Sequence, residues 1–289
     1  MIVIYVLFYL KTINYNNILM SSIDETNYDN YLLYLRTVQS SAFRVLIEAL
    51  KEILTDTNLE FDSKNIKVVA MDPSHTVLVH LKLDSDKFEK YYCPNRLLLG
   101  INTINLFKLI KALQNNDILT LFVEKNNTNQ LGIRMENGEA NQITQYKMNL
   151  MDLNQENIQI PPLEFESVIT LPSCNFQKIC RDMYNLSDNI EITTFGEQIT
   201  FRCKGDIADQ ETSIGQSSNG GMNYVQNDNC SDIVQGVFSL KYLVLFTKCT
   251  NLSSTTELYV KNDYPLIIRY QVANLGEVKL CLAPINIHD

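Results

Sequence analysis

The sequence is poor in several residue types that mark particular classes of protein. It has no tryptophan, and only ten glycines and three histidines among 289 residues. Its seven cysteines form no CxxC pair, and His75 and His80 are the only histidines near one another, so no zinc-ligand spacing is present. We therefore interpret the cysteines as reduced thiols packed as small hydrophobic side chains, and we expect no metal or other cofactor.

Long apolar stretches are also missing. The run MIVIYVLFYL at the amino terminus is too short to span a bilayer, and it lacks the leading positive charge and cleavage site of a signal peptide. A more ordinary polar start opens at Met20. We therefore expect residues 1–31 to be a poorly ordered extension, and we expect no membrane partner.

The residues that are abundant indicate a folded protein rich in strands. The composition is 45% hydrophobic and 20% charged, which is typical of a globular chain, and 289 residues suffice for two domains. Valine, isoleucine, tyrosine, phenylalanine and threonine are plentiful. These residues favour short strands with a few helices, an α+β fold.

The chain repeats a pattern of an amphipathic helix followed by a strand. Residues 40–56 resemble 173–189, and residues 101–123 resemble 237–260, at an offset of roughly 133 to 136 residues. The repeat predicts two similar domains, at 32–150 and at 167–289 with a short C-terminal tail. Between them, residues 151–166 contain two prolines and no helical period, which indicates an extended connection.

The hydrophobic periodicity predicts the positions of the elements. We expect helices at 42–54, 103–113, 174–185 and 239–248. We expect strands at 32–38, 65–71, 76–83, 88–93, 117–124, 130–136, 143–150, 166–171, 189–194, 197–203, 255–261, 264–272 and 277–283, with a single further strand inside the polar stretch 204–230.

Basic residues recur on the outer side of each predicted helix. At about 100° per residue, pairs of cations lie opposite the apolar stripe in the second, third and fourth helices. In the first helix they lie beside the stripe, and Glu48 and Glu52 interrupt them. The eight bases are Arg44, Lys51, Lys108, Lys111, Lys178, Arg181, Lys241 and Lys248.

This segregation matters because the chain as a whole is acidic, with a formal net charge of −9. A single helix with two outward lysines is usually only a solvated surface. Four equivalent helices with aligned bases indicate a polyanion that is bound through its phosphates. No aromatic residues alternate with these bases, so base stacking is not indicated. We expect loose, sequence-independent contact with the backbone of duplex DNA.

Six blocks of sequence resemble one family, in order and without large gaps between residues 32 and 285. They are VVAMDPSHTVLVHLKL (68–83), LGINTINLFKLIKAL (99–113), YKMNLMDL (146–153), FQKICRDM (176–183), FSLKYLVLFTKCTNLSST (238–255) and YPLIIRYQVANLGEVKLCLAPI (264–285). All six are similar to proliferating cell nuclear antigen, the sliding clamp of eukaryotes and their large DNA viruses.

The resemblance implies a DNA-clamp fold and a function without chemistry. In this family each subunit has two similar domains, with two helices on one face of antiparallel sheets, and three subunits form a closed ring. A loader places the ring around duplex DNA, where it tethers the replicative polymerase and other replication and repair proteins as a processivity factor. The resemblance also implies a location in the nucleus, or at a viral replication site if the source is a large DNA virus.

The resemblance also assigns three sets of residues. The eight bases named above would line the pore. A pocket for partner peptides that contain a glutamine, an aliphatic residue and two aromatics would be walled by Met71, His75, Leu78, Ile158, Ile160, Pro161, Pro265, Ala283 and Pro284. The subunit interface would pair the strand of Tyr146 and Met148 with the neighbour's strand of Glu211 and Ser213.

The chain departs from the family pattern at three positions. Cys281 stands where an aromatic residue usually forms part of the pocket wall, and Ile285 stands where a lysine is common. We therefore expect the aromatic half of the partner motif to be read differently. Gly196 aligns with the lysine that accepts ubiquitin in the family, so we expect that modification to be absent.

Two other classes of function stay open at this point. A metal-dependent nuclease would need grouped carboxylates, whereas Asp72, Asp152 and Asp182 are dispersed. His75, beside Asp72 and Ser74, could be read as a catalytic base, but no nucleophile elbow or phosphate loop accompanies it. The remaining alternative is a regulatory paralogue, or one subunit of a heterotrimer, that binds partners without encircling DNA.

Overall fold

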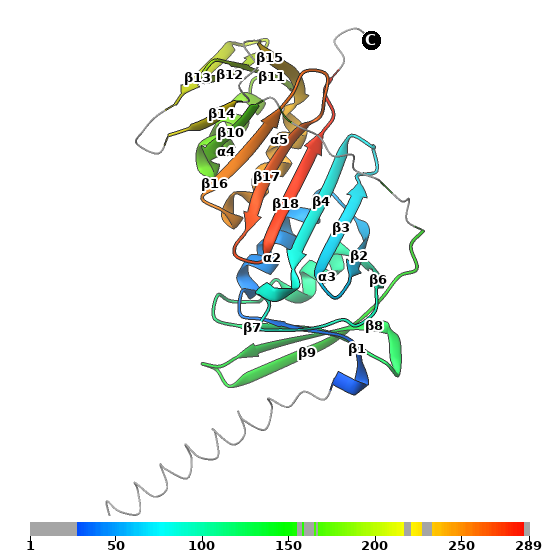
Figure 1. The fold of residues 1–289 in the computed structure, drawn as a ribbon. Helices are drawn as coiled ribbons and strands as arrows, with labels where there is room; N and C mark the ends of the chain where they lie inside the picture. Colours follow the sequence, from blue (N-terminus) through cyan, green and yellow to red (C-terminus); the bar gives the residue numbers. More distant parts are fainter. Residues whose placement is uncertain are drawn as a thin grey trace, which may run out of the picture.

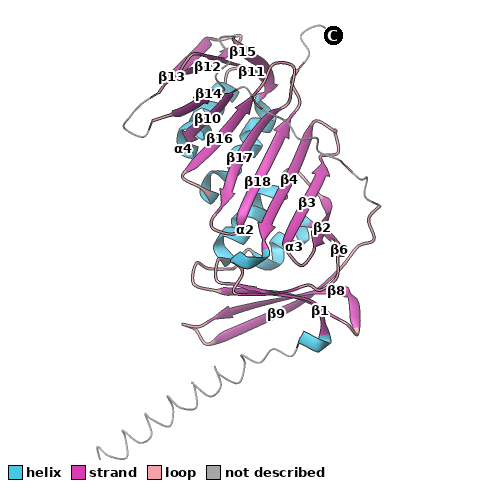
Figure 2. Ribbon diagram, in the orientation of Figure 1, coloured by secondary structure: helices cyan, strands magenta, loops and turns pink. Residues whose placement is uncertain are grey.

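The computed structural model describes residues 28–154, 158, 165, 167–216, 221–226 and 233–285. It contains three antiparallel sheets, and Figure 1 shows two of them placed at the two ends of a long central sheet. The helices lie together on one face of the central sheet (Figure 2). The opposite face of that sheet carries no helix.

The central sheet has nine strands and joins the two domains. Its order is β14-β10-β16-β17-β18-β4-β3-β2-β6. The second domain contributes β10 (Ser167–Pro172), β14 (Asn223–Gln226), β16 (Thr255–Val260), β17 (Leu266–Val272) and β18 (Gly276–Leu282). The first domain contributes β2 (Asp56–Phe61), β3 (Asn65–Met71), β4 (Val77–Asp84) and β6 (Leu97–Asn102).

Each domain also forms one of the end sheets. In the first domain the order is β5-β1-β7-β8-β9, made of β1 (Tyr31–Thr37), β5 (Lys90–Tyr92), β7 (Ile118–Glu124), β8 (Asn127–Asn137) and β9 (Gln142–Asn149). In the second domain the order is β13-β12-β11-β15, made of β11 (Asn189–Phe195), β12 (Gln198–Lys204), β13 (Asp209–Gly215) and β15 (Val234–Ser239). Among the described residues, β9 and β13 each have a partner strand on only one side.

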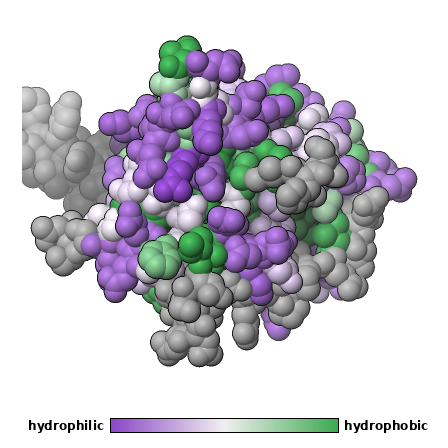
Figure 3. All heavy atoms as spheres, turned by 90° about the horizontal axis from the view of Figure 1, so that it is seen from above, coloured by the Kyte–Doolittle hydropathy of each residue, from purple (hydrophilic) through white to green (hydrophobic). Residues whose placement is uncertain are grey.

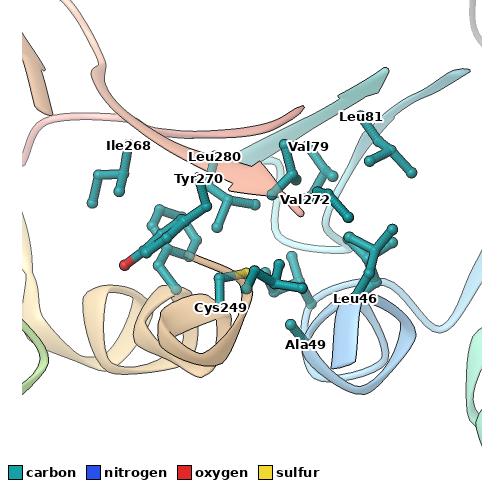
Figure 4. Close-up of a cluster of buried hydrophobic side chains, with 14 of the residues drawn as sticks. Leu46, Ala49, Val79, Leu81, Cys249, Ile268, Tyr270, Val272 and Leu280 are labelled. Atoms are coloured by element: carbon teal, nitrogen blue, oxygen red, sulfur yellow. The ribbon is translucent and has the colours of Figure 1, made fainter. Parts of the chain in front are cut away.

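The helices pack through the apolar stripes that the sequence predicts. They are α2 (Ser40–Leu50), α3 (Thr103–Ile110), α4 (Ser173–Tyr184) and α5 (Leu240–Phe246), and α5 continues as the 3₁₀ helix η3 (Thr247–Leu252). Two further 3₁₀ turns are η1 (Tyr28–Asn30) and η2 (Ser85–Lys87). Figure 4 shows Leu46 and Ala49 of α2 and Cys249 of η3 against Val79, Tyr270 and Leu280 of the central sheet. Burial of these side chains holds the helix layer onto the sheet.

The sequence repeat is reproduced as a repeat of strand order. The order β5-β1-β7-β8-β9 of the first domain corresponds to β14-β10-β16-β17-β18 of the second. In the same way, β6-β2-β3-β4 corresponds to β15-β11-β12-β13. The predicted α+β class and the two-domain clamp architecture are therefore confirmed.

A seam between β18 and β4 joins the two domains in the central sheet. Seven antiparallel residue pairs, from Gly276↔Leu83 to Leu282↔Val77, form this seam. Gly276 has a φ of +158°, and a Cβ at that position would lie 2.1 Å from the carbonyl oxygen of Lys82. The close approach of the two strands therefore requires glycine.

Several predicted element boundaries were wrong. All four helices end earlier than predicted, so Lys51 and Lys111 follow the last residues of α2 and α3, and Lys248 lies on η3. The change from α-helix to 3₁₀ helix after α5 begins at Thr247, whose hydroxyl donates to the carbonyl of Val244 at 2.8 Å.

Three strands were missed, and the stretch 204–230 contains two strands, β13 and β14, where one was expected. The missed strands β2, β6 and β15 carry polar residues or a glycine at inward positions, which hides the alternation. In β15, Gly236 leaves room for the ring of Phe238, which a Cβ would approach to 2.7 Å.

Within the described ranges, no helix has the length and apolar character needed to cross a membrane. The same residues contain no group of three or more His, Cys, Asp or Glu side chains that could hold a metal ion. The six described cysteines are free thiols, and burial raises the pKa of Cys249 to about 12.

Candidate functional site

The helix layer presents exposed and unpaired bases. Six of the eight predicted bases, Lys108, Lys111, Lys178, Arg181, Lys241 and Lys248, are exposed. Among the described residues, none of these six has a carboxylate oxygen within 4.0 Å. Their recorded contacts are weak: Lys108 Nζ donates to Asn105 Oδ1 at 3.4 Å, and Lys241 Nζ lies 5.5 Å from the ring centre of Tyr242.

All six bases are carried by one layer of elements. The first two α-helices contact each other, α2 contacts η3, and η3 contacts both α4 and α5. Because each helix buries its apolar stripe against the sheet, the bases lie on the side of the layer that faces away from the sheet. The layer is therefore a continuous surface from which positive charge projects.

The first helix differs from the other three. Arg44 is half-buried, with Nη1 3.8 Å from Glu48 Oε2. Lys51 is also half-buried; it forms an ion pair with Glu52 and lies 5.0 Å from the ring centre of Phe107. The acids that interrupt this helix in the sequence thus engage both bases, and α2 presents less free charge than the rest of the layer.

A cleft opens in the first domain at the end of β3. It has a volume of about 360 Å³ and contains three of the predicted pocket residues, Met71, His75 and Ile158. The remaining lining comes from residues 54–58 and from Val69, Ala70, Asp72, Pro73, Leu153 and Asn154. Sequence reasoning missed the residues of β2 because the strand itself was missed.

A hydrogen-bonded turn forms one wall of the cleft. Asp72 Oδ1 accepts hydrogen bonds from the backbone nitrogens of Thr76 at 2.8 Å and Val77 at 2.7 Å. Burial acts to raise the pKa of Asp72, but the hydrogen bonds from Ser74 and these two amides outweigh it and hold the pKa below its usual value. His75 is exposed at φ +56° within this turn, so Asp72 is a structural acceptor that shapes the loop.

The start of the connecting segment forms the opposite wall. Met151 N donates to the carbonyl of Gly100 at 2.8 Å, and Asn58 Nδ2 donates to the carbonyl of Leu153 at 3.3 Å. A Cβ on Gly100 would lie 2.2 Å from the Met151 carbonyl oxygen, so glycine permits this docking. The docking places Leu153 and Ile158 beside the end of β3.

The other predicted pocket residues continue the surface without lining the hollow. Leu78 stands between Met71 and Cys281 in the register of the sheet. Ala283 N donates to the carbonyl of Thr76 at 3.1 Å. Pro265 immediately precedes β17, and Pro284 follows Ala283 after the end of β18. Ile160 and Pro161 lie outside the described residues.

An apolar row crosses the helix-free face of the central sheet beside the cleft. It runs in register from Met71 through Leu78, Cys281 and Ile267 to Tyr259. Phe165 of the connecting segment packs edge-on against Tyr259, with ring centres 5.4 Å apart. Burial raises the pKa of Cys281 to about 11, so this thiol is neutral and counts as part of the apolar row.

The predicted interface residues lie on the edge strands β9 and β13. Tyr146 and Met148 are on β9, and Met148 turns its side chain into the chain's own core, where 8% of its surface is exposed. On β13, Glu211 pairs with Arg202 at 2.7 Å, and the hydroxyls of Ser213 and Thr200 are 2.9 Å apart. Both strands therefore offer an unpaired backbone edge, while their side chains are held by the neighbouring strand.

Comparison with known families matches nearly all of the described chain. Residues 32–158 match the model of the proliferating cell nuclear antigen N-terminal domain, and residues 159–285 match that of the C-terminal domain. The chain belongs to the proliferating cell nuclear antigen family. It is a DNA sliding clamp.

Two relatives illustrate the range of the similarity. A protein of Paramecium bursaria Chlorella virus 1, described as a probable DNA polymerase sliding clamp, is 38% identical over 261 residues, 89% of this chain and 98% of the viral protein. The proliferating cell nuclear antigen of Chaetomium thermophilum is 33% identical over 259 residues, 88% of this chain and 98% of the fungal protein. The family match begins at residue 32.

Proposed function

We propose that three copies of this chain close into a ring around duplex DNA, with the helix layer facing the DNA. The observation that carries this proposal is the set of six exposed bases without acidic partners, concentrated on one layer of an acidic protein. DNA phosphates attract these basic side chains whatever the nucleotide sequence, so the ring can slide along the duplex. The unpaired edges of β9 and β13 supply the contacts that close the ring.

The cleft is the proposed docking site for the clamp's partners. Its apolar lining includes Met71 of β3 and Ile158 of the connecting segment, a setting suited to an extended peptide with a few anchoring side chains. We propose that a replicative polymerase, the clamp loader and repair proteins dock here in turn. The corresponding place of action is the nucleus, or the viral replication site if the source is a large DNA virus.

The proposed role involves no chemistry by the clamp itself. Asp72 is held by backbone amides in its turn, Asp152 lies on the connecting segment and Asp182 on α4. These positions do not assemble a carboxylate pair for metal-assisted hydrolysis. A purified sample assayed for nuclease activity with Mg²⁺ is expected to be inactive.

Removing the free bases tests the proposal. The variant Lys108→Ala/Lys111→Ala/Lys178→Ala/Arg181→Ala should lower polymerase processivity by about tenfold or more, because four phosphate contacts per subunit are lost. Its mass by light scattering should stay at three times the 33.2 kDa of the chain, since none of the four lies on β9 or β13.

The matched control is Arg44→Ala/Lys51→Ala. These bases are already engaged by Glu48 and Glu52, so their loss should reduce processivity much less. Equal effects of the two variants, or no effect of either, would contradict the assignment of the pore. A wild-type protein that persists as a monomer would instead favour the regulatory paralogue.

A further inference from the structure

The seam inside the chain pairs two strands that are equivalent to the two strands of the proposed junction between copies. In the seam, β18 pairs with β4. By the repeat of strand order, β9 is the counterpart of β18 and β13 is the counterpart of β4. Both counterparts stand at the end of a sheet, and among the described residues neither pairs with a second strand. If the proposed ring forms through them, each junction between copies repeats the geometry of the seam.

The equivalence of single residues follows from the inward-facing apolar pair nearest the C-terminal end of each strand, in which Ile214 is half-buried and the other members are buried. Met148 faces Leu131 across β8 as Leu282 faces Leu266 across β17, so Met148 corresponds to Leu282. On the other side, Ile214 faces Ile199 as Leu83 faces Ile66, so Ile214 corresponds to Leu83.

The seam places Gly276 opposite Leu83 and Leu282 opposite Val77. Transfer of this register places Gln142 opposite Ile214 and Met148 opposite Ala208 of the neighbouring copy. A shift by one residue would turn the side chains of β9 to the wrong face, and a shift by two would break the equivalence of these apolar pairs.

In this register the charges on the two edges are complementary. The one charged residue of β9 is Lys147, and the charged residues of β13 are Asp209 and Glu211. Lys147 stands opposite Asp209, and Gln145 stands opposite Glu211. Among the described residues Asp209 has no cation within 4.0 Å, although Lys204 is its neighbour on β12. Its carboxylate is therefore free to receive Lys147.

We propose that an ion pair between Lys147 of one copy and Asp209 of the next selects the partner edge and the register of the junction. This inference rests on the proposed ring and identifies the partner of each edge as a second copy in a head-to-tail arrangement. Lys147 Nζ is already 3.0 Å from Glu124 Oε2, which holds the ammonium group on the same face of the sheet. Glu124 lies on β7, on the side of β9 away from its free edge, so Lys147 exchanges this partner for Asp209 when the copies meet.

The same charges oppose the wrong pairings. Two β13 edges brought together would place Asp209 and Glu211 against like charges, and two β9 edges would bring their Lys147 side chains together. The pairing of unlike edges avoids this repulsion, and repeated pairing of unlike edges closes a ring when the rotation between copies fits. Figure 3 looks onto the end of the molecule that carries the four-stranded sheet, where most described atoms are hydrophilic.

Charge reversal tests the ion pair. Asp209→Lys should place two cations at each junction and raise the protein concentration needed for trimer formation by about tenfold, measured by analytical ultracentrifugation. Lys147→Glu should act in the same direction, and the double variant Lys147→Glu/Asp209→Lys should recover most of the loss. Asp206→Lys, the same charge change just before β13, should have little effect.

The outcomes separate the two proposals. A monomeric wild-type protein would overturn the ring itself. A trimeric wild type whose stability is unchanged by Asp209→Lys, or a double variant that assembles no better than the two single variants, would overturn the ion pair and leave the ring intact.

Cysteine cross-linking tests the register independently of charge. Ile143 and Ser213 are both exposed and stand opposite each other in the inferred register. Ile143→Cys/Ser213→Cys should therefore form covalent dimers and trimers on mild oxidation, seen on a non-reducing gel. The mismatched Ile143→Cys/Glu211→Cys, displaced by two residues on the same face, should not. Equal cross-linking of both, or cross-linking of the mismatched variant alone, would overturn the register.

Discussion

At the scale of single residues, the acids beside a base decide how much of its charge reaches a ligand. Arg44 and Lys51 occupy the helix layer as the other bases do, but Glu48 and Glu52 neutralise them locally. Lys178 and Arg181 on α4 have no acidic partner within 4.0 Å among the described residues and remain available to phosphate. Counting basic residues on a helix therefore overestimates its contribution to DNA binding unless their partners are known.

Met71 is the residue through which the cleft is best tested. Its side chain is 40% exposed at the mouth of the cleft and begins the apolar row along the sheet. Met71→Ala should weaken binding of a peptide containing a glutamine, an aliphatic residue and two aromatics by about 1–3 kcal/mol, because apolar surface buried on binding is lost. Isothermal titration calorimetry measures the change.

The control for this experiment is another exposed aliphatic residue of the first domain. Leu98 is 49% exposed on β6 and does not line the cleft, so Leu98→Ala should leave the affinity for the peptide unchanged. An unchanged affinity in Met71→Ala would show that the peptide binds elsewhere. Cys281 is smaller than an aromatic residue, so the adjoining apolar row projects less from the sheet at its centre.

At the scale of the elements, the seam between β18 and β4 holds the two domains in one sheet. Gly276→Ala should lower the free energy of unfolding by about 2–4 kcal/mol, because the added Cβ would overlap backbone atoms of β4 in a conformation that L residues rarely adopt. Urea denaturation followed by circular dichroism measures the loss. Gly138→Ala is the matched control, since a Cβ there meets nothing within 4 Å, and its effect should stay within about 0.5 kcal/mol. Equal stabilities for the two variants would contradict the role given to Gly276.

Elements whose signal is local could be predicted from the sequence, and elements that depend on distant partners could not. The apolar stripe of Phe176, Ile179 and Met183 lies within α4 itself, so the sequence predicted the helix and its outward-facing basic residues. The strand β2 reads as a polar turn, and it becomes a strand because β3 and β6 pair with it on both sides. The lining of the cleft depends on that strand and on a connection from residues 151–154, and so it was only partly predicted.

The same limit applies to the bases. Periodicity identified which residues face outward, because the helix turn fixes that geometry locally. It did not identify where the helices end, so Lys248 was assigned to a helix that becomes η3 before reaching it. The contact of Arg44 could be anticipated from the position of Glu48, since residues four apart on a helix lie near enough to interact. The contact of Lys51 with Glu52 could not, because Lys51 follows the last residue of α2.

At the scale of the whole molecule, the matched domains begin later than the described structure does. The family match starts at residue 32, yet Tyr28 of η1 stacks on Tyr92 at 4.8 Å between ring centres and meets Tyr34 edge-on at 5.7 Å. Tyr31 packs in turn against Tyr34 and Phe122. This aromatic cluster attaches residues 28–31 to the end sheet of the first domain, so these four residues belong to the folded unit. The rest of the extension that we expected over 1–31 lies outside the described residues.

Two truncated variants separate the roles of these parts. A chain that starts at Tyr28 retains the cluster and both edge strands, so it should form trimers with the melting temperature of the full chain. A chain that starts at Leu32 loses the rings of Tyr28 and Tyr31, and each aromatic contact contributes about 0.5–1.5 kcal/mol. It should still form trimers, but its melting temperature should fall by about 5 °C or more, since about 1 kcal/mol shifts a domain of this size by 2–4 °C. Differential scanning fluorimetry and light scattering give the two readings. Loss of the trimer on removal of residues 1–27 would assign the extension to assembly, and equal melting temperatures for the two variants would remove the aromatic cluster from the folded unit.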